Sequence, residues 1–168
     1  MAISLATISR SKFKPPITVL HGPPGIGKST IGAKAPSPVF IPTEDGLVGM
    51  SVDAFPLCTK WQQVMDCVIA LYQEEHSYHT VVVDSLSALE LLIWRQVAND
   101  HQKTSIDDIP YGRGHGYAME YWQQFMNGIA ANELHFAVFV HVRDDRNDAL
   151  AVRGESERIR KNASVGAV

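Results

Sequence analysis

Short apolar runs alternate along the chain with longer stretches in which apolar positions recur every three or four residues. Four of the runs are rich in β-branched residues and predict strands at 17–21, 39–42, 80–84 and 135–141. The run at 80–84 has no polar alternation, which is typical of a parallel strand that is covered on both faces. These runs therefore predict a sheet that is mostly parallel.

The stretches between these runs have the spacing of amphipathic helices. Helices are predicted from the glycine-rich segment to about residue 34 and at 59–75, 85–99 and 117–133, with Thr59 as the N-cap of the second. Residues 100–116 are polar and glycine-rich and are expected to form a long loop. Strands that alternate with helices predict an α/β layered domain with right-handed crossovers.

The composition fits one soluble globular domain. The chain has 168 residues, of which 45% are hydrophobic and 20% are charged, and these values exclude a disordered chain or a coiled-coil rod. The net charge of −3 excludes a strongly basic molecule, although five Lys or Arg residues precede the first acid, Glu44. Two cysteines without metal-ligand spacing, and no apolar run long enough for a membrane span, predict a cytoplasmic protein without a structural zinc site.

A glycine-rich motif carries the strongest chemical signal. Residues 22–29 fit the pattern G-x-x-x-x-G-K-[ST] in full, between a predicted strand and a predicted helix, although a chance glycine turn with a surface lysine is the alternative. Backbone N–H groups and the helix N-terminus form a phosphate cradle in this motif. Lys28 is expected to reach the β- and γ-phosphates of ATP, and the Ser29 hydroxyl to bind Mg²⁺. The residues expected to bind the nucleotide are Gly22, Pro23, Pro24, Gly25, Ile26, Gly27, Lys28, Ser29 and Thr30.

Three further polar residues lie where predicted strands end. Asp84 suits a Mg²⁺ ligand, directly or through water, although an Asp after a strand is often a helix N-cap. Glu44 suits a group that orients or deprotonates the attacking water, or a solvated turn acid. His141 suits a contact to the γ-phosphate, or it simply ends its strand. Since ligands of parallel α/β sheets bind at the carboxyl ends of the strands, these residues are expected to converge with the glycine loop.

Together these segments resemble the RecA-like ATPase core. The resemblance covers roughly residues 15–142, and it rests on residues 22–30, 40–44, 81–89 and 139–141. More closely, the chain is similar to phage-encoded nucleotide-binding proteins of that superfamily, some of which act as single-strand annealing recombinases. The loop at 108–112, followed by Tyr121 and Trp122, is also similar to that group. The resemblance implies an α/β, three-layer P-loop NTPase fold over residues 1–142, with helices on both faces of a mostly parallel RecA-like sheet.

The resemblance also implies how the site is completed. The strand at 135–141 would lie between the P-loop strand and the Asp84 strand, so that His141 would sit beside the nucleotide as a sensor. Glu44 would be the catalytic glutamate, with ATP and Mg²⁺ as ligands. A basic residue of a neighbouring copy would assist hydrolysis, and the candidates are Arg95, Lys103, Arg113 and Arg143. Relatives continue with further strands, whereas residues 143–168 are expected to form a polar tail that lacks the usual C-terminal part.

The leading functional hypothesis is a Mg²⁺-dependent ATPase that acts in phage DNA recombination in the bacterial host cytoplasm. Single-stranded DNA and further copies of the chain are the expected partners, and a membrane is not. Arg10, Lys12 and Lys14 form either a DNA-facing patch or a solvated basic face. The alternative is an ATP-dependent switch or interaction module with little hydrolysis and no DNA binding. A small-molecule or nucleotide kinase is a third interpretation, against which no second substrate pocket or arginine-rich lid is visible.

Overall fold

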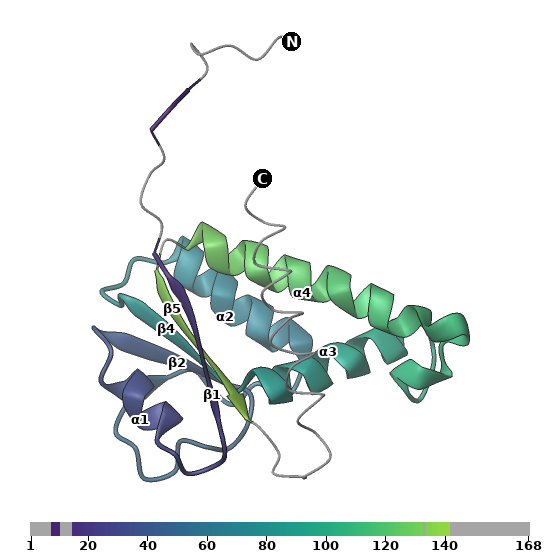
Figure 1. Cartoon of the computed structure of the whole chain (residues 1–168), viewed down its shortest axis with the longest axis horizontal. Helices are drawn as coiled ribbons and strands as arrows, with labels where there is room; N and C mark the ends of the chain where they lie inside the picture. Colours follow the sequence, from purple (N-terminus) through teal and green to yellow (C-terminus); the bar gives the residue numbers. More distant parts are fainter. Residues whose placement is uncertain (1–7, 11–14, 133, 142–168) are drawn as a thin grey trace.

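A parallel sheet of five strands forms the middle layer of the protein (Figure 1). The computed structural model describes residues 8–10, 15–132 and 134–141, the last seven by their backbone. The strands are β1 (Ile17–Gly22), β2 (Pro38–Pro42), β3 (Asp53–Ala54), β4 (Thr80–Asp84) and β5 (His135–His141).

The strand order across the sheet is β1-β5-β4-β2-β3. β5 therefore lies between the P-loop strand and the strand that ends in Asp84, as the resemblance implies. The four predicted strands are confirmed to within one residue at each end. The hydrophobic pattern misses β3 because this strand spans only two residues, both exposed, and so leaves no apolar run.

Helices cover both faces of the sheet and complete three layers (Figure 1). α2 (Trp61–Gln73), α3 (Leu86–Asp100) and α4 (Arg113–Ala131) lie on one face, and the short α1 (Lys28–Ala33) lies on the other. None of the helices in the described part of the chain is long and apolar enough to cross a membrane.

The central strand β4 shows why both faces are covered. Alternate residues of a strand point to opposite faces. Val81 and Val83 pack in the core with α2, α3 and α4, whereas Val82 packs on the other face with Phe40 and with Ala33 of α1. All three valines are fully buried. The expectation of a three-layer α/β fold with a doubly covered parallel strand is confirmed.

The prediction of Thr59 as the N-cap of the second helix is wrong. α2 begins at Trp61, and Lys60 occupies the N-cap position. The side chain of Gln63 reaches back instead, because its Oε1 accepts hydrogen bonds from the backbone N–H groups of Thr59 at 2.8 Å and Lys60 at 3.1 Å. A side chain inside the first turn thus binds the backbone ahead of the helix.

The predicted loop at 100–116 is also wrong over its second half. Two 3₁₀ turns occupy Ile106–Asp108 and Pro110–Gly112, and α4 begins directly afterwards, four residues earlier than expected. Gly114 explains the difference, since a Cβ on it would lie 2.5 Å from the carbonyl oxygen of Ile106. Only glycine lets the first turn of α4 pack so closely on the preceding turn. This packing outweighs the low helix propensity of glycine.

Candidate functional site

The glycine-rich loop connects β1 to α1 and surrounds the end of the Lys28 side chain. Gly25 and Gly27 have φ values of +78° and +95°, a left-handed backbone that favours glycine. Successive N–H groups in such a loop can point to one centre and bind an anion. Lys28 is 6% exposed, and its Nζ donates hydrogen bonds to the carbonyl oxygens of Gly22 at 2.8 Å and Pro23 at 3.0 Å. The loop and its lysine therefore form one connected unit at the carboxyl end of β1.

A hydrogen bond joins this loop to β4. Oγ of Ser29 donates to Oδ2 of Asp84 at 2.6 Å, across 55 positions of the sequence. Asp84 is 2% exposed, and a hydrogen bond to a carboxylate is stronger than one between neutral groups. The N-cap of α3 is Ser85, whose Oγ accepts from the N–H of Ala88 at 3.4 Å. Because Ser85 caps the helix, the Asp84 carboxylate is directed to Ser29 instead.

Thr43 ties the end of β2 to the end of β4. Its Oγ1 donates to the carbonyl oxygen of Ser85 at 2.6 Å and accepts from the N–H of Ser85 at 2.8 Å. Its own N–H donates to the carbonyl oxygen of Asp84 at 2.8 Å. Sequence reasoning overlooks Thr43 as a positioning residue. The sequence signal that could have identified Thr43 is a threonine between a buried strand and an acid. Just past the end of a strand, a threonine hydroxyl can form hydrogen bonds with backbone groups that are no longer paired in the sheet.

Glu44 follows Thr43 directly and lies at the same edge. Its N–H donates to the carbonyl oxygen of Asp84 at 3.4 Å. A Cβ placed on Gly46 would lie 3.8 Å from Oδ2 of Asp84 and 3.9 Å from Cγ of Glu44, so both acids approach the same glycine. The structure thus brings together the P-loop, Asp84 and Glu44, as their positions at strand ends predict.

The backbone of His141 lies at this edge too. In the β1–β5 pairing it stands opposite Gly22, the first residue of the P-loop, while Asp84 stands opposite Phe139 in the β4–β5 pairing. The role of its side chain stays a prediction. Of the candidate basic residues, Arg95, Lys103 and Arg113 are exposed on or near α3 and α4, and Arg143 lies outside the described residues.

The donor atoms at this edge fit a hard divalent cation. Ser29 Oγ and Asp84 Oδ2 are oxygen atoms 2.6 Å apart. Mg²⁺ at nucleotide sites is typically held by one or two carboxylates together with phosphate oxygens and water, rather than by a complete protein cage. Within the described ranges, no group of three or more His, Cys, Asp or Glu residues is arranged to hold a metal ion. The residues present therefore suit a cation that arrives with a nucleotide.

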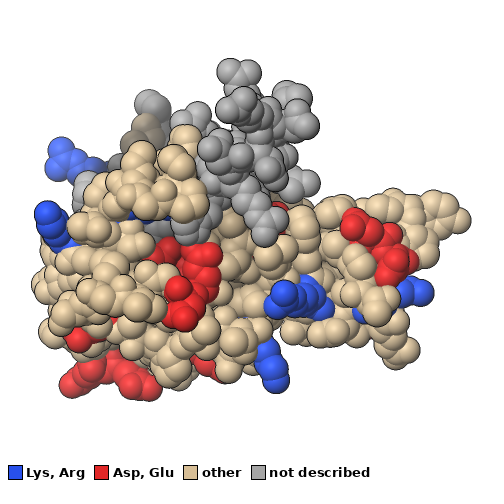
Figure 2. All heavy atoms as spheres, turned by 90° about the horizontal axis from the view of Figure 1, so that it is seen from below, with Lys and Arg blue, Asp and Glu red and all other residues tan. Residues whose placement is uncertain are grey.

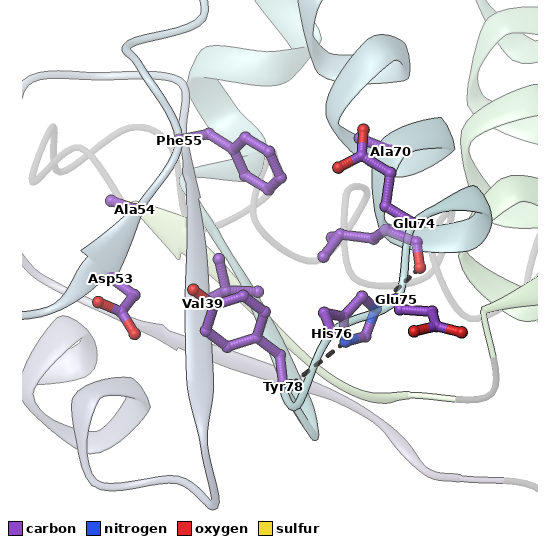
Figure 3. A pocket seen from close by; sticks show the side chains of 10 residues that line it. Val39, Asp53, Ala54, Phe55, Ala70, Glu74, Glu75, His76 and Tyr78 are labelled. Atoms are coloured by element: carbon purple, nitrogen blue, oxygen red, sulfur yellow. Dashed lines mark hydrogen bonds between the residues drawn. The ribbon is translucent and has the colours of Figure 1, made fainter.

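A separate cavity of about 360 Å³ lies at the other end of the sheet (Figure 3). Its walls come from the start of β2, from β3 and from the end of α2 with the segment that follows. Asp53, Glu74 and Glu75 contribute carboxylates to its lining. Like charges repel, so this cavity is unsuited to the phosphates of a nucleotide. The P-loop edge is the better candidate.

Comparison with known families gives one match. Residues 14–163 match the model of a family described as an AAA domain, a stretch that contains every residue of the P-loop edge named above. A comparison with curated proteins found no match.

Proposed function

The chain belongs to the AAA domain family of P-loop ATPases, and on this premise we propose that it binds Mg²⁺ and ATP at the P-loop edge and hydrolyses ATP with Glu44 as the general base. The observation that carries the proposal is the hydrogen bond between Ser29 and Asp84. It places together the hydroxyl and the carboxylate that such sites use for Mg²⁺, beside the loop that would hold the phosphates.

Phosphate binding would change the partners of Lys28. Its Nζ now donates to two neutral carbonyl oxygens, those of Gly22 and Pro23. Phosphate oxygens are charged acceptors and form stronger hydrogen bonds with an ammonium group. The lysine would therefore turn from the loop backbone to the β- and γ-phosphates. Mg²⁺, held by Ser29 and Asp84, would neutralise part of the phosphate charge.

Hydrolysis would use Glu44, the acid that follows Thr43 at the end of β2. Glu44 would take a proton from water while the water oxygen attacks the γ-phosphorus. The bond between this phosphorus and the bridging oxygen breaks, and ADP and phosphate leave. Thr43 would fix the starting point of the Glu44 side chain, since three of its hydrogen bonds reach Asp84 and Ser85. Lys28 and the loop N–H groups would stabilise the developing charge.

The test is ATP turnover by Glu44→Gln beside wild type. The amide keeps the shape of the side chain but is a very weak base, so turnover is expected to fall on the order of 10²-fold or more while ATP affinity stays unchanged. Glu74→Gln, which changes an acid of the distant cavity, is the matched control and should turn over ATP like wild type. Equal turnover by Glu44→Gln and wild type would overturn the role of Glu44 and favour the alternative, an ATP-dependent switch.

The nucleotide site itself is tested by affinity rather than by turnover. Lys28→Ala removes the ammonium group that would contact the phosphates, so the affinity for a fluorescent ATP analogue should fall at least tenfold, about 1.4 kcal/mol. An affinity equal to that of wild type would contradict ATP binding at this loop.

We further propose that the nucleotide state controls assembly of the protein on single-stranded DNA in phage recombination. Support comes from the resemblance of the P-loop and Asp84 segments to such proteins. The described surface seen from below shows separate small groups of basic and acidic side chains, with no continuous basic face (Figure 2). The basic N-terminal segment is the better DNA candidate, in which Arg10 is exposed and Lys12 and Lys14 lie outside the described residues.

Filter binding of single-stranded DNA at low salt, with and without ATP, tests this part of the proposal. Binding that weakens as salt rises is expected, because contacts to DNA phosphates release counterions. No binding at low salt would overturn the recombination role and leave the ATPase proposal unaffected.

A further inference from the structure

The two cysteines of the chain form a buried pair. Cys58 lies three residues before α2, and Cys67 lies in the second turn of that helix. Their Sγ atoms are 3.8 Å apart, and both thiols are reduced. The residues are 2% and 8% exposed. The nine-residue spacing matches no redox or metal motif, so the contact arises from the way the chain enters α2.

The contact makes the two sulfur atoms unequal. The hydrogen bond between the two sulfur atoms lowers the pKa of Cys58 below its ordinary value, although burial and the nearby Asp66 act in the opposite direction. The same hydrogen bond, together with burial, raises the pKa of Cys67. The thiolate is the reactive form of a cysteine, so these directions make Cys58 the expected nucleophile of the pair.

The chain on either side of Cys58 lies at the surface. Pro56, Thr59 and Lys60 are exposed, and Leu57 is 44% exposed. Bringing Cys58 to solvent would require a local opening of the segment 55–60, which breaks its backbone hydrogen bonds to β2, from the N–H of Phe55 to Phe40 at 2.9 Å and from the N–H of Cys58 to Pro42 at 2.8 Å. Local openings of this kind have lower free energies than global unfolding. Hydrogen peroxide is small and uncharged, and so it is the type of oxidant that can reach such a sulfur atom.

We propose that Cys58 and Cys67 form an oxidisable dithiol that hydrogen peroxide closes to an intramolecular disulfide. The Cys58 thiolate attacks one peroxide oxygen, the O–O bond breaks, and the departing hydroxide takes up a proton to form water. The sulfur of Cys67 then attacks the sulfur of the resulting Cys58 sulfenic acid, and the S–O bond breaks. The departing oxygen leaves as water with the proton of Cys67. In sum, two thiols lose two electrons and two protons, and one peroxide is reduced to two waters.

Closing the pair requires only a short movement. A disulfide holds its sulfur atoms about 2.05 Å apart, so the 3.8 Å contact must shorten by about 1.8 Å. The movement would affect the end of β2, because the N–H of Cys58 donates to the carbonyl oxygen of Pro42 at 2.8 Å. Pro42 immediately precedes Thr43 and Glu44. Oxidation would thus tie the end of β2 to α2 through Cys58, whatever the function of the P-loop edge.

The experiment compares wild type with Cys58→Ser and Cys67→Ser in hydrogen peroxide, followed by mass spectrometry and by labelling with dimedone, which traps sulfenic acids. Wild type should lose two hydrogens, remain monomeric on a non-reducing gel and recover with dithiothreitol. Cys67→Ser should collect a dimedone adduct at Cys58. Cys58→Ser should react more slowly than Cys67→Ser, since burial still raises the pKa of Cys67.

Three results would overturn the proposal: reaction only in urea, a disulfide between two chains, or equal rates for the two serine variants. Cys67→Ala provides a second background in case a buried hydroxyl destabilises the protein, and it should give the Cys58 adduct more slowly than Cys67→Ser, because alanine removes the hydrogen bond that lowers the pKa of Cys58. Circular dichroism before oxidation establishes that each variant is folded. All of these readouts concern thiol chemistry, so they are separate from the test of ATP hydrolysis.

Discussion

Two glycines at the start of α4 allow a sharp test of the packing described above. Both lie in the first turns of the helix, and alanine is a better helix former than glycine by about 1 kcal/mol. A Cβ on Gly116 meets nothing within 4 Å. A Cβ on Gly114 would lie 2.5 Å from the carbonyl oxygen of Ile106 and 2.6 Å from its Cγ1. Backbone cannot move aside as a flexible side chain can, so the two substitutions should have opposite effects.

The expected magnitudes follow from these contacts. Gly116→Ala should stabilise the protein by up to about 1 kcal/mol. Gly114→Ala adds an overpacking cost of up to about 3 kcal/mol and should destabilise it by about 2 kcal/mol after the same helix gain. For a domain of this size the difference corresponds to roughly 6–12 °C in Tm.

Urea denaturation followed by circular dichroism gives both free energies of unfolding. The urea midpoint should fall for Gly114→Ala and rise for Gly116→Ala, with the slope of the transition unchanged. Equal shifts for the two variants would refute the reasoning, because they would mean that the first turn of α4 does not pack closely on the 106–108 turn.

Three further predictions concern other parts of the molecule. Thr43→Val removes both side-chain hydrogen bonds to the buried Ser85 peptide groups and should lower the free energy of unfolding by about 2–4 kcal/mol in urea denaturation. Thr43→Ser keeps the hydroxyl and should retain most of the wild-type free energy of unfolding. Gly27→Ala forces a φ of +95° on a residue with a Cβ and should weaken binding of an ATP analogue; Gly49→Ala, with a φ of +81° outside the P-loop, carries similar strain and should leave the affinity unchanged. Burial first, and then a hydrogen bond to a carboxylate, raise the pKa of Tyr121 from 10.0 to about 12. Between these values the unfolded state ionises while the folded state does not, so stability should fall as pH rises from 10 to 12, and Tyr121→Phe should reduce this slope in unfolding measured against pH.

The parts of the fold that the sequence predicts are those decided by local patterns. Strand β4 is readable because Val81, Val82 and Val83 form an unbroken apolar run, as a doubly covered parallel strand requires. The start of α4 is not readable, since it depends on Gly114 packing against a turn eight residues earlier. The start of α2 is not readable either. The sequence pattern favours Thr59 as the N-cap, but the Gln63 side chain binds the backbone N–H groups of Thr59 and Lys60 instead, and residue spacing does not distinguish these two arrangements.

The candidate site also contains contacts that the sequence predicts and contacts that it does not. Ser29 and Asp84 are predicted to meet because parallel strands place their carboxyl ends at one edge, and their atoms lie 2.6 Å apart. Thr43 is overlooked because its partner, the backbone of Ser85, carries no sequence signal. The sequence also gives no signal for the contact between Cys58 and Cys67, since this contact arises from the way the chain enters α2 and not from a motif.

The hydrogen bonds of Thr43 at the end of β2 give the candidate site two parts that move on different timescales. Thr43 holds the backbone ahead of Glu44 to the end of β4 through hydrogen bonds to the backbone of Asp84 and Ser85, so displacing the Glu44 backbone would break contacts between β2 and β4, a slow and cooperative opening. The glycine loop is an exposed connection, whose rearrangements belong to the nanosecond-to-microsecond range. A ligand would therefore bind between a glycine loop that can adjust its conformation and Glu44, whose backbone is already held in place. Amide hydrogen exchange would resolve the two parts, with Thr43 exchanging slowly and the loop amides becoming protected only when an anion binds.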